Sequence, residues 1–153
     1  MACSALDVIL KDLLFCKLET TEMNSRELQE LGRAVKNFTT KVSLCLGLGL
    51  LHRNEAKTLI TLNDVRNKFA HKWNASFNDS EIQKKCEMLD IEFKDTLQKS
   101  EDDIAFDKFG YTASDLMRNL IARTSGFADE VEYAHTLQSL KIHREYIPMW
   151  SLT

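Results

Sequence analysis

The chain has 153 residues, of which 44% are hydrophobic and 28% charged, and its net charge is −3. This composition is typical of one globular domain with a real core, and the low net charge argues against general, sequence-blind coating of DNA. One proline and five glycines provide few chain breaks, which favours long helices over the many short strands of a β-sandwich. We therefore expect an all-α, single-domain helical bundle over residues 1–153, with about six to seven helices.

Membrane and metal chemistry find little support in the sequence. No apolar run is long enough for a membrane span, and the N-terminus lacks the pattern of a signal peptide. We expect a cytoplasmic protein without membrane contact and without a cofactor. The four cysteines are scattered singly, with no spacing suited to zinc, so we interpret them as small buried hydrophobic residues and predict no metal site. They are Cys3, Cys16, Cys45 and Cys86.

Charge is distributed unevenly along the middle of the chain. Residues 33–72 contain eight Lys or Arg against two Asp or Glu, whereas residues 73–107 contain four Lys against ten Asp or Glu. The two segments therefore carry net charges of +6 and −6. Such asymmetry indicates either a face for a macromolecular partner or pairing of the two segments with each other, within one chain or across a dimer.

The N-terminal part of the chain predicts two helices. Residues 5–17 place apolar side chains at the three-and-four spacing of an amphipathic helix. The inward positions are Leu6, Ile9, Leu10, Leu13, Leu14 and Cys16. A polar break follows at residues 20–24, where Asn24 and Glu27 resemble a capping box. The second helix then runs to about Asn37, with Leu28, Leu31 and Val35 inward.

The third predicted helix, residues 41–51, is apolar nearly all round and must be enclosed. Thr39 or Thr40 is expected to cap it. Gly47 and Gly49 each cost about 1 kcal/mol relative to alanine inside a helix. They indicate either an earlier helix end or close approach of another backbone, and we favour close packing.

A tight connection at residues 52–54, with Asn54 as N-cap, leads to a fourth helix over residues 55–72. Its buried stripe comprises Leu59, Leu62, Val65 and Phe69. After a loop at 73–79, Asn78 is expected to cap a fifth helix that starts near Ser80. That helix carries Ile82, Cys86 and Leu89 and later Phe93 and Leu97.

The acidic stretch 100–110 is expected to be a loop that separates the first hundred residues from a C-terminal helical part, residues 112–147. Thr112 with Asp115 gives a cap signal for a helix that has Leu116, Leu120 and Ile121 inward. Ser125-Gly126 is a possible end or bend. Helical periodicity continues over residues 127–146, before Pro148.

The best candidate for a binding or catalytic site is the segment Arg66-Asn67-Lys68-Phe69-Ala70-His71, near the end of the fourth predicted helix. Asn67 and His71 are four residues apart and share a helical face, while Arg66 lies one step round with a long reach. An arginine, an amide and a histidine together can hold a phosphate or another anion.

Four blocks between Phe38 and Leu89 resemble the MtlR family of bacterial mannitol operon repressors. They are Phe38-Thr39-Thr40-Lys41-Val42, Leu46-Gly47-Leu48-Gly49-Leu50-Leu51, Arg66 to His71, and Ser76-Phe77-Asn78-Asp79-Ser80-Glu81-Ile82 leading to Cys86. The order and spacing of the blocks make residues 33–98 MtlR-like. The resemblance implies an all-helical transcriptional regulator, a repressor of sugar-alcohol uptake genes that acts through protein contacts at least as much as through DNA.

The residues themselves show no helix-turn-helix or ribbon-type DNA reader. We expect a homodimer formed through the apolar third and fourth helices, with a protein or nucleic-acid partner on their basic surface. The residues expected to bind that partner are Lys41, Arg53, Lys57, Lys68 and Lys72.

The segment from Arg66 to His71 is also similar to the signature of HEPN-fold proteins, helical dimers many of which cut RNA without a metal. That resemblance implies that Arg66 stabilises the scissile phosphate, that His71 is the general acid or base, and that Asn67 orients one of them. The alternative function is therefore a metal-independent endoribonuclease of a toxin or defence system, or its inactive descendant.

A third interpretation gives the segment a structural role only. A histidine in the last turn of a helix interacts favourably with the helix dipole, and Arg66 and Asn67 can tie down the loop that follows. Polar clusters of this kind are often structural networks. The sequence thus leaves open whether the protein is an enzyme.

Overall fold

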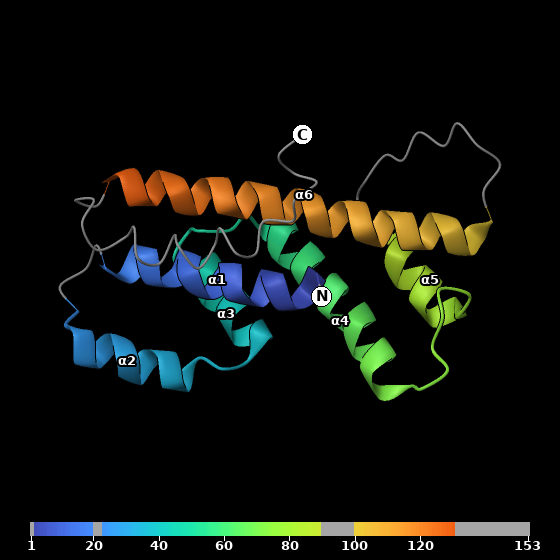
Figure 1. Cartoon of the computed structure of the whole chain (residues 1–153), viewed down its shortest axis with the longest axis horizontal. Coiled ribbons are helices and arrows are strands. Elements are labelled where there is room, and N and C mark those ends of the chain that lie inside the picture. The colour runs from blue at the N-terminus through green and yellow to red at the C-terminus, as the bar shows by residue number, and fades with distance from the viewer. Residues whose placement is uncertain (1, 20–22, 90–99, 131–153) are drawn as a thin grey trace.

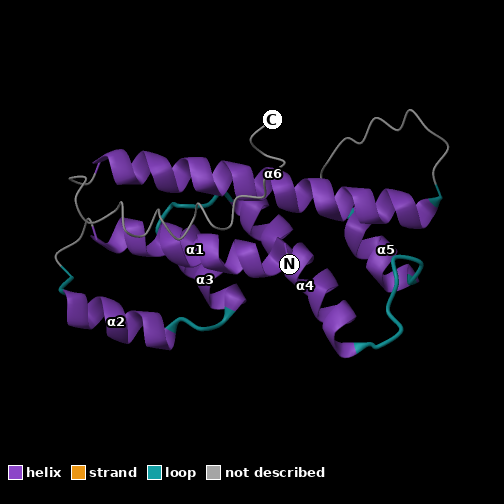
Figure 2. Cartoon of the chain, viewed as in Figure 1, coloured by secondary structure: helices purple, strands orange, loops and turns teal. Residues whose placement is uncertain are grey.

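The computed structural model describes residues 2–19, 23–89 and 100–130, and within these ranges the chain forms six α-helices and no strands (Figure 1). The all-α class is therefore confirmed, as the colouring of Figure 2 makes plain. The helices are α1 (Ala2–Glu19), α2 (Ser25–Ala34), α3 (Phe38–Gly47), α4 (Arg53–His71), α5 (Ser80–Glu87) and α6 (Glu101–Glu130).

Helix α1 lies at the centre of the bundle and contacts α3, α4 and α6. The 30-residue helix α6 packs along α1 and continues to α5, so that it covers one side of the molecule (Figure 1). Helix α4 packs against α3 on one side and α5 on the other. By contrast, α2 contains no buried residue and lies at the periphery.

The amphipathic stripe predicted for the first helix is confirmed in full. Its six inward positions, Leu6, Ile9, Leu10, Leu13, Leu14 and Cys16, are all buried. Burying one leucine side chain contributes about 1.5–3 kcal/mol, which explains why this helix organises the core. The four cysteines are buried and free, as expected, and burial raises the pKa of the Cys45 thiol to about 11.

Side-chain caps mark where the helices begin, and only some of the caps predicted from the sequence are the observed ones. The Asn24 and Glu27 capping box is confirmed, with the Asn24 N–H donating to a Glu27 carboxylate oxygen at 2.8 Å. In α3 the cap is Asn37, whose side chain accepts from the Thr39 N–H at 2.9 Å. The predicted cap at Thr39 or Thr40 is wrong, because both residues lie inside the helix.

The same shift by one or two residues occurs at α4 and α5. Helix α4 begins at Arg53 after His52, so the predicted N-cap at Asn54 is wrong. Helix α5 begins at the predicted Ser80, but its N-cap is Asp79 rather than Asn78, and the Asp79 carboxylate accepts from the Glu81 N–H at 3.0 Å.

The end of α3 contradicts the expected close packing at its glycines. The helix stops at Gly47, and a Cβ added at either Gly47 or Gly49 would meet nothing within 4 Å. Gly49 instead has a φ of +70°, in the left-handed region that glycine adopts without steric cost. The alternative of an earlier helix end is therefore the one that the structure adopts. The full enclosure expected for residues 41–51 is also wrong, because Leu48, just after the observed helix end, is 42% exposed.

The acidic segment 100–110 is not a loop but the beginning of α6. Ser100 precedes the helix, and its hydroxyl accepts from the Asp103 N–H at 3.4 Å and donates to the Asp103 carboxylate at 2.6 Å. Acidic residues in the first turn of a helix also interact favourably with the positive end of its dipole. The charges interpreted as a sign of a loop are thus those that favour a helix start.

Helix α6 also continues through both breaks that the sequence suggested. Thr112, expected as a cap, is buried within the helix, where its hydroxyl donates to the Lys108 carbonyl at 2.6 Å. Ser125-Gly126 does not end the helix. The buried stripe of α6 runs from Ala105 through Ala113, Leu116 and Leu120. Burial of this stripe outweighs the low helix propensity of single residues such as Thr112 and Gly126.

Two sequence predictions lie outside the described residues. These are the continuation of the fifth helix through Phe93 and Leu97, and the C-terminal helical part beyond residue 130. Within the described ranges, no helix has the length and apolarity that crossing a membrane would require.

Candidate functional site

The last two turns of α4 present the segment from Arg66 to His71 at the surface. Val65 is fully buried on the opposite side of the helix, and Phe69 packs against Phe77 of the following loop with ring centroids 4.9 Å apart. Phe77 in turn contacts Phe106 and Phe109 of α6. This aromatic cluster fixes the end of α4 and therefore the positions of the polar side chains around it.

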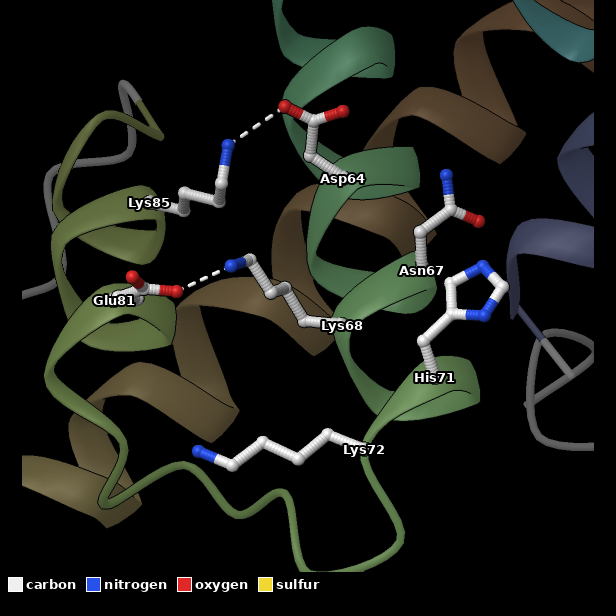
Figure 3. A pocket seen from close by; sticks show the side chains of 7 residues that line it. All are labelled: Asp64, Asn67, Lys68, His71, Lys72, Glu81 and Lys85. Carbon is white, nitrogen blue, oxygen red and sulfur yellow. Dashed lines mark hydrogen bonds and ion pairs between the residues drawn. The ribbon is translucent and has the colours of Figure 1, made fainter.

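The three residues with possible catalytic roles are only partly brought together. Asn67 and His71 lie next to each other on α4 (Figure 3) and line one open pocket of about 500 Å³. The Arg66 guanidinium donates to the Asn67 side-chain oxygen at 3.1 Å. However, Arg66 lines a different pocket, between α4 and the beginnings of α1 and α3.

His71 is exposed, and its ring has no hydrogen-bond partner among the described residues. Both ring nitrogens are therefore available to hydrogen-bond a ligand. In the described part of the chain no carboxylate orients it, so the arrangement lacks the third group that positions a base in a catalytic triad.

The pocket beside His71 is lined by ion pairs that bridge α4 and α5 (Figure 3). Lys68 pairs with Glu81, and Lys85 pairs with Asp64 at 2.6 Å. Lys72, which also lines the pocket, pairs with Asp79 at 2.5 Å. Each lysine therefore has a carboxylate partner, and the charges of this pocket largely cancel.

All three pairs join the basic segment to the acidic one, and in two of them the lysine belongs to the basic segment. Of the alternatives that the charge asymmetry left open, pairing within one chain is therefore observed here. The pKa shifts of the paired groups have the directions that ion pairing predicts. The hydrogen bond from Lys68 lowers the pKa of Glu81, and that from Lys72 lowers the pKa of Asp79. The hydrogen bond to Glu81 raises the pKa of Lys68.

The other basic residues expected to bind a partner occupy two different environments. Lys41 is 5% exposed and its ammonium group donates to both carboxylate oxygens of Asp7, at 2.7 and 2.8 Å. It therefore joins α3 to α1 and is not part of the exposed basic surface. Arg53 and Lys57 are exposed on α4.

Arg53 and Lys57 line an open groove of about 460 Å³ between α3, α4 and the end of α5. We call it the α3–α4 groove. Its apolar lining includes Val42, Leu46, Ile60 and Met88, and Met88 is 70% exposed. Sequence reasoning identified the basic residues but not Met88 or Lys85, because the position of α5 relative to α4 depends on the tertiary fold. Helical spacing does predict that Lys57 and Ile60 lie close together.

The loop after α4 is held by contacts that the sequence did not reveal. Ala75 N–H donates to the Lys72 carbonyl at 3.0 Å, and Phe77 packs on Phe69. In the described residues Arg66 bonds to Asn67 and not to this loop. The proposed anchoring of the loop by Arg66 and Asn67 is therefore wrong, although His71 does lie in the last turn of α4.

Comparisons with known proteins provide no relative for this chain. No family model, no curated protein and no solved structure matches it. Within the described residues, no group of three or more His, Cys, Asp or Glu side chains could hold a metal ion.

Proposed function

We propose that this chain is a transcriptional regulator of the mannitol-operon-repressor type, which acts by binding a partner protein in the α3–α4 groove. The observation that carries the proposal is the groove itself, in which an apolar floor is bordered by the exposed cations Arg53 and Lys57. The sequence blocks that resemble the MtlR family include α3, which forms one wall.

The chemistry of the groove favours an acidic amphipathic helix as the occupant. Such a helix would place apolar side chains on Leu46, Ile60 and Met88 and carboxylates beside Arg53 and Lys57. A second copy of the chain is less suitable, because a twofold contact at this groove would bring like charges together. The homodimer expected from the sequence stays a prediction that a molar-mass measurement in solution would test.

A photo-crosslinking amino acid at Met88 tests the location of the interface. The groove position should capture a defined protein in cells, whereas the same amino acid at Arg118, exposed on α6, should not. If the crosslinked product is a dimer of this chain, the occupant of the groove is a second copy and not another protein. Equal capture from both positions would contradict the proposal.

The regulatory role is tested separately with charge reversals. Replacing Arg53 and Lys57 by glutamate should abolish binding of the captured protein and reproduce the change in transcript levels caused by deleting the gene. The matched control, Arg118→Glu, should do neither. Lost binding with unchanged transcripts would show that the groove is an interface without a role in transcription.

A second candidate function is metal-independent cleavage of RNA. The observation that favours it is the adjacent pair of Asn67 and His71, with the Arg66 guanidinium bonded to Asn67. Attack of a ribose 2′-hydroxyl on phosphorus requires a general acid or base and a cation for the developing charge. His71 and Arg66 would supply these, and two symmetry-related copies would supply the cluster twice.

Incubation of the purified protein with structured and unstructured RNA in EDTA tests this candidate. Cleavage that disappears in His71→Ala, with the circular dichroism spectrum unchanged, would support the nuclease. The exposure of His71 means that the substitution should leave folding intact. Cleavage that survives in His71→Ala would point to a contaminant, and its absence from the wild type would leave the regulator as the proposal.

A further inference from the structure

The pocket that contains Arg66 lies on a different side of α4 from the ion pairs. It has a volume of about 440 Å³ and is formed where the first turns of α1, the segment before α3, and α4 meet. Its polar lining consists of Ser4, Asp7, Lys36, Asn63 and Arg66. This volume is within the range of small-molecule sites, about 300–1,000 Å³.

The charges of this pocket do not cancel. Arg66 and Lys36 are exposed, and among the described residues neither has a carboxylate partner. The carboxylate of Asp7 lines the pocket too, but both its oxygens accept from the buried Lys41. With that pair neutral, Arg66 and Lys36 leave two positive charges for a ligand, in contrast to the pocket beside His71.

Neutral hydrogen-bonding groups stand beside the two cations. In the described part of the chain, the Ser4 hydroxyl and the Asn63 amide have no partner within the protein. The first turn of α1 contains no acidic residue, so the helix dipole adds to the positive potential rather than being compensated. The Cys3 thiol donates to the Leu62 carbonyl at 3.7 Å. Burial raises the pKa of this thiol, and the opposite effect of the nearby Arg66 charge is smaller. Cys3 is thus a wall of the pocket and not a nucleophile.

We propose that this pocket binds a phosphate monoester. The dianion matches the two unpaired cations, since Arg66 can bind two phosphate oxygens with its planar guanidinium and Lys36 can approach as a point charge. The pocket is larger than a phosphate ion needs, so that Ser4 and Asn63 are available to the esterified group. The site shares no residue with the α3–α4 groove, whereas Arg66 belongs both to this pocket and to the cluster considered for RNA cleavage.

Titration of the full chain with phenyl phosphate, followed by backbone amide NMR, tests the assignment. The largest shifts should occur at Ser4 and Asn63, and phenol should produce none of them. Replacing both Lys36 and Arg66 by glutamine should weaken binding at least tenfold. Because both side chains are exposed, the double variant should fold normally.

Matched controls remove an exposed arginine and an exposed lysine elsewhere, Arg118→Gln on α6 and Lys84→Gln on α5. These should bind phenyl phosphate like the wild type. The proposal is overturned if the Lys36 and Arg66 variant binds equally well, if phenol causes the same shifts, or if the shifts map to another surface.

Competition then identifies where the phosphate comes from. A 5′-phosphorylated RNA oligonucleotide that displaces phenyl phosphate better than the same oligonucleotide without the phosphate would assign the pocket to nucleic-acid ends. If neither displaces it, the pocket binds small phosphate esters. If both displace it equally, the surface recognises the RNA backbone rather than a monoester, and the proposal fails.

Discussion

At the scale of single residues, Arg123 makes the most informative set of contacts. Its guanidinium donates to the Leu50 carbonyl at 2.6 Å and to both oxygens of Glu55, at 3.1 and 2.8 Å. Glu55 also accepts from the His52 N–H at the start of α4. One side chain of α6 thus joins the connection that follows α3 to the beginning of α4.

The pKa of Glu55 shows that these contacts stabilise its charged form. Burial raises its pKa, but hydrogen bonds from Arg123 and from the His52 N–H outweigh burial, and the net pKa is lowered from 4.5. The unfolded state therefore binds a proton at higher pH than the folded state. The contribution to stability is fully present above the unfolded pKa and is lost as the pH falls through the lower, folded pKa.

We expect Glu55→Gln to reduce the free energy of unfolding at pH 7 by about 2 kcal/mol, as for loss of a charged hydrogen bond that is partly buried. The difference from the wild type should shrink as the pH falls below about 4.5, where the unfolded chain begins to take up a proton, and should be lost once the pH falls through the lower pKa of the folded carboxylate. Urea unfolding from pH 7 to pH 3 measures both effects. A constant difference across this range would show that the charge of Glu55 is not the cause.

Residue-level features were predictable from the sequence only where their partners are local. The two residues of the capping box, Asn24 and Glu27, are only three positions apart, and the sequence predicts the box correctly. Lys41 was assigned to an exposed basic surface because nothing in its neighbourhood reveals Asp7, which lies on another helix. Nothing in the sequence around Arg123 reveals its contacts either, because its partners are about seventy positions away.

At the scale of elements, hydrophobic periodicity predicted where helices exist better than where they end. The stripe of α1 was correct at every position, because one buried face repeats every three or four residues. The Arg66 to His71 segment was also correctly placed at the end of α4. The errors of one or two residues occurred at Asn37, His52 and Asp79, where neighbouring polar residues compete as caps.

Alanine substitutions at Gly47, the last residue of α3, and at Gly49, two residues later, test the observed helix end. They should change the free energy of unfolding in opposite directions. Gly47→Ala should raise the free energy of unfolding by up to about 1 kcal/mol, because alanine favours helix and its Cβ has open space. Gly49→Ala should lower it by about 1 kcal/mol, because φ is +70°. Chemical unfolding of the two variants compares them directly. Equal effects of one sign would contradict the helix end at Gly47.

The start of α6 can be tested through its cap. Ser100→Ala should lower the free energy of unfolding by about 1 kcal/mol, since the hydroxyl accepts from the Asp103 N–H. Ser100→Asp keeps an acceptor at the same position and should retain most of the stability. Thermal unfolding of both variants is the measurement. If alanine and aspartate behave alike, the acidic segment does not depend on this cap.

At the scale of the whole molecule, the opposite charges of two sequence segments become a bridge between α4 and α5. Lys68 with Glu81 and Lys72 with Asp79 join the end of α4 to the start of α5 around the loop between them. The sequence predicted that the segments could pair but not in which register, because that register depends on how the aromatic residues Phe69 and Phe77 close the loop.

Reversal of one charge should weaken this bridge, and reversal of both should restore it. We expect Lys68→Glu to lower the melting temperature at low salt, because it places like charges opposite each other, and the double exchange Lys68→Glu with Glu81→Lys to recover most of the loss. Both side chains are substantially exposed, so the effect should be small and should fade near 1 M salt, where the screening length is about 3 Å. Calorimetry of the wild type and the two variants at low and high salt gives the comparison. A loss that persists in the double exchange or at high salt would mean that the Lys68 stem contributes through packing, and that pairing of the two segments does not stabilise the bundle.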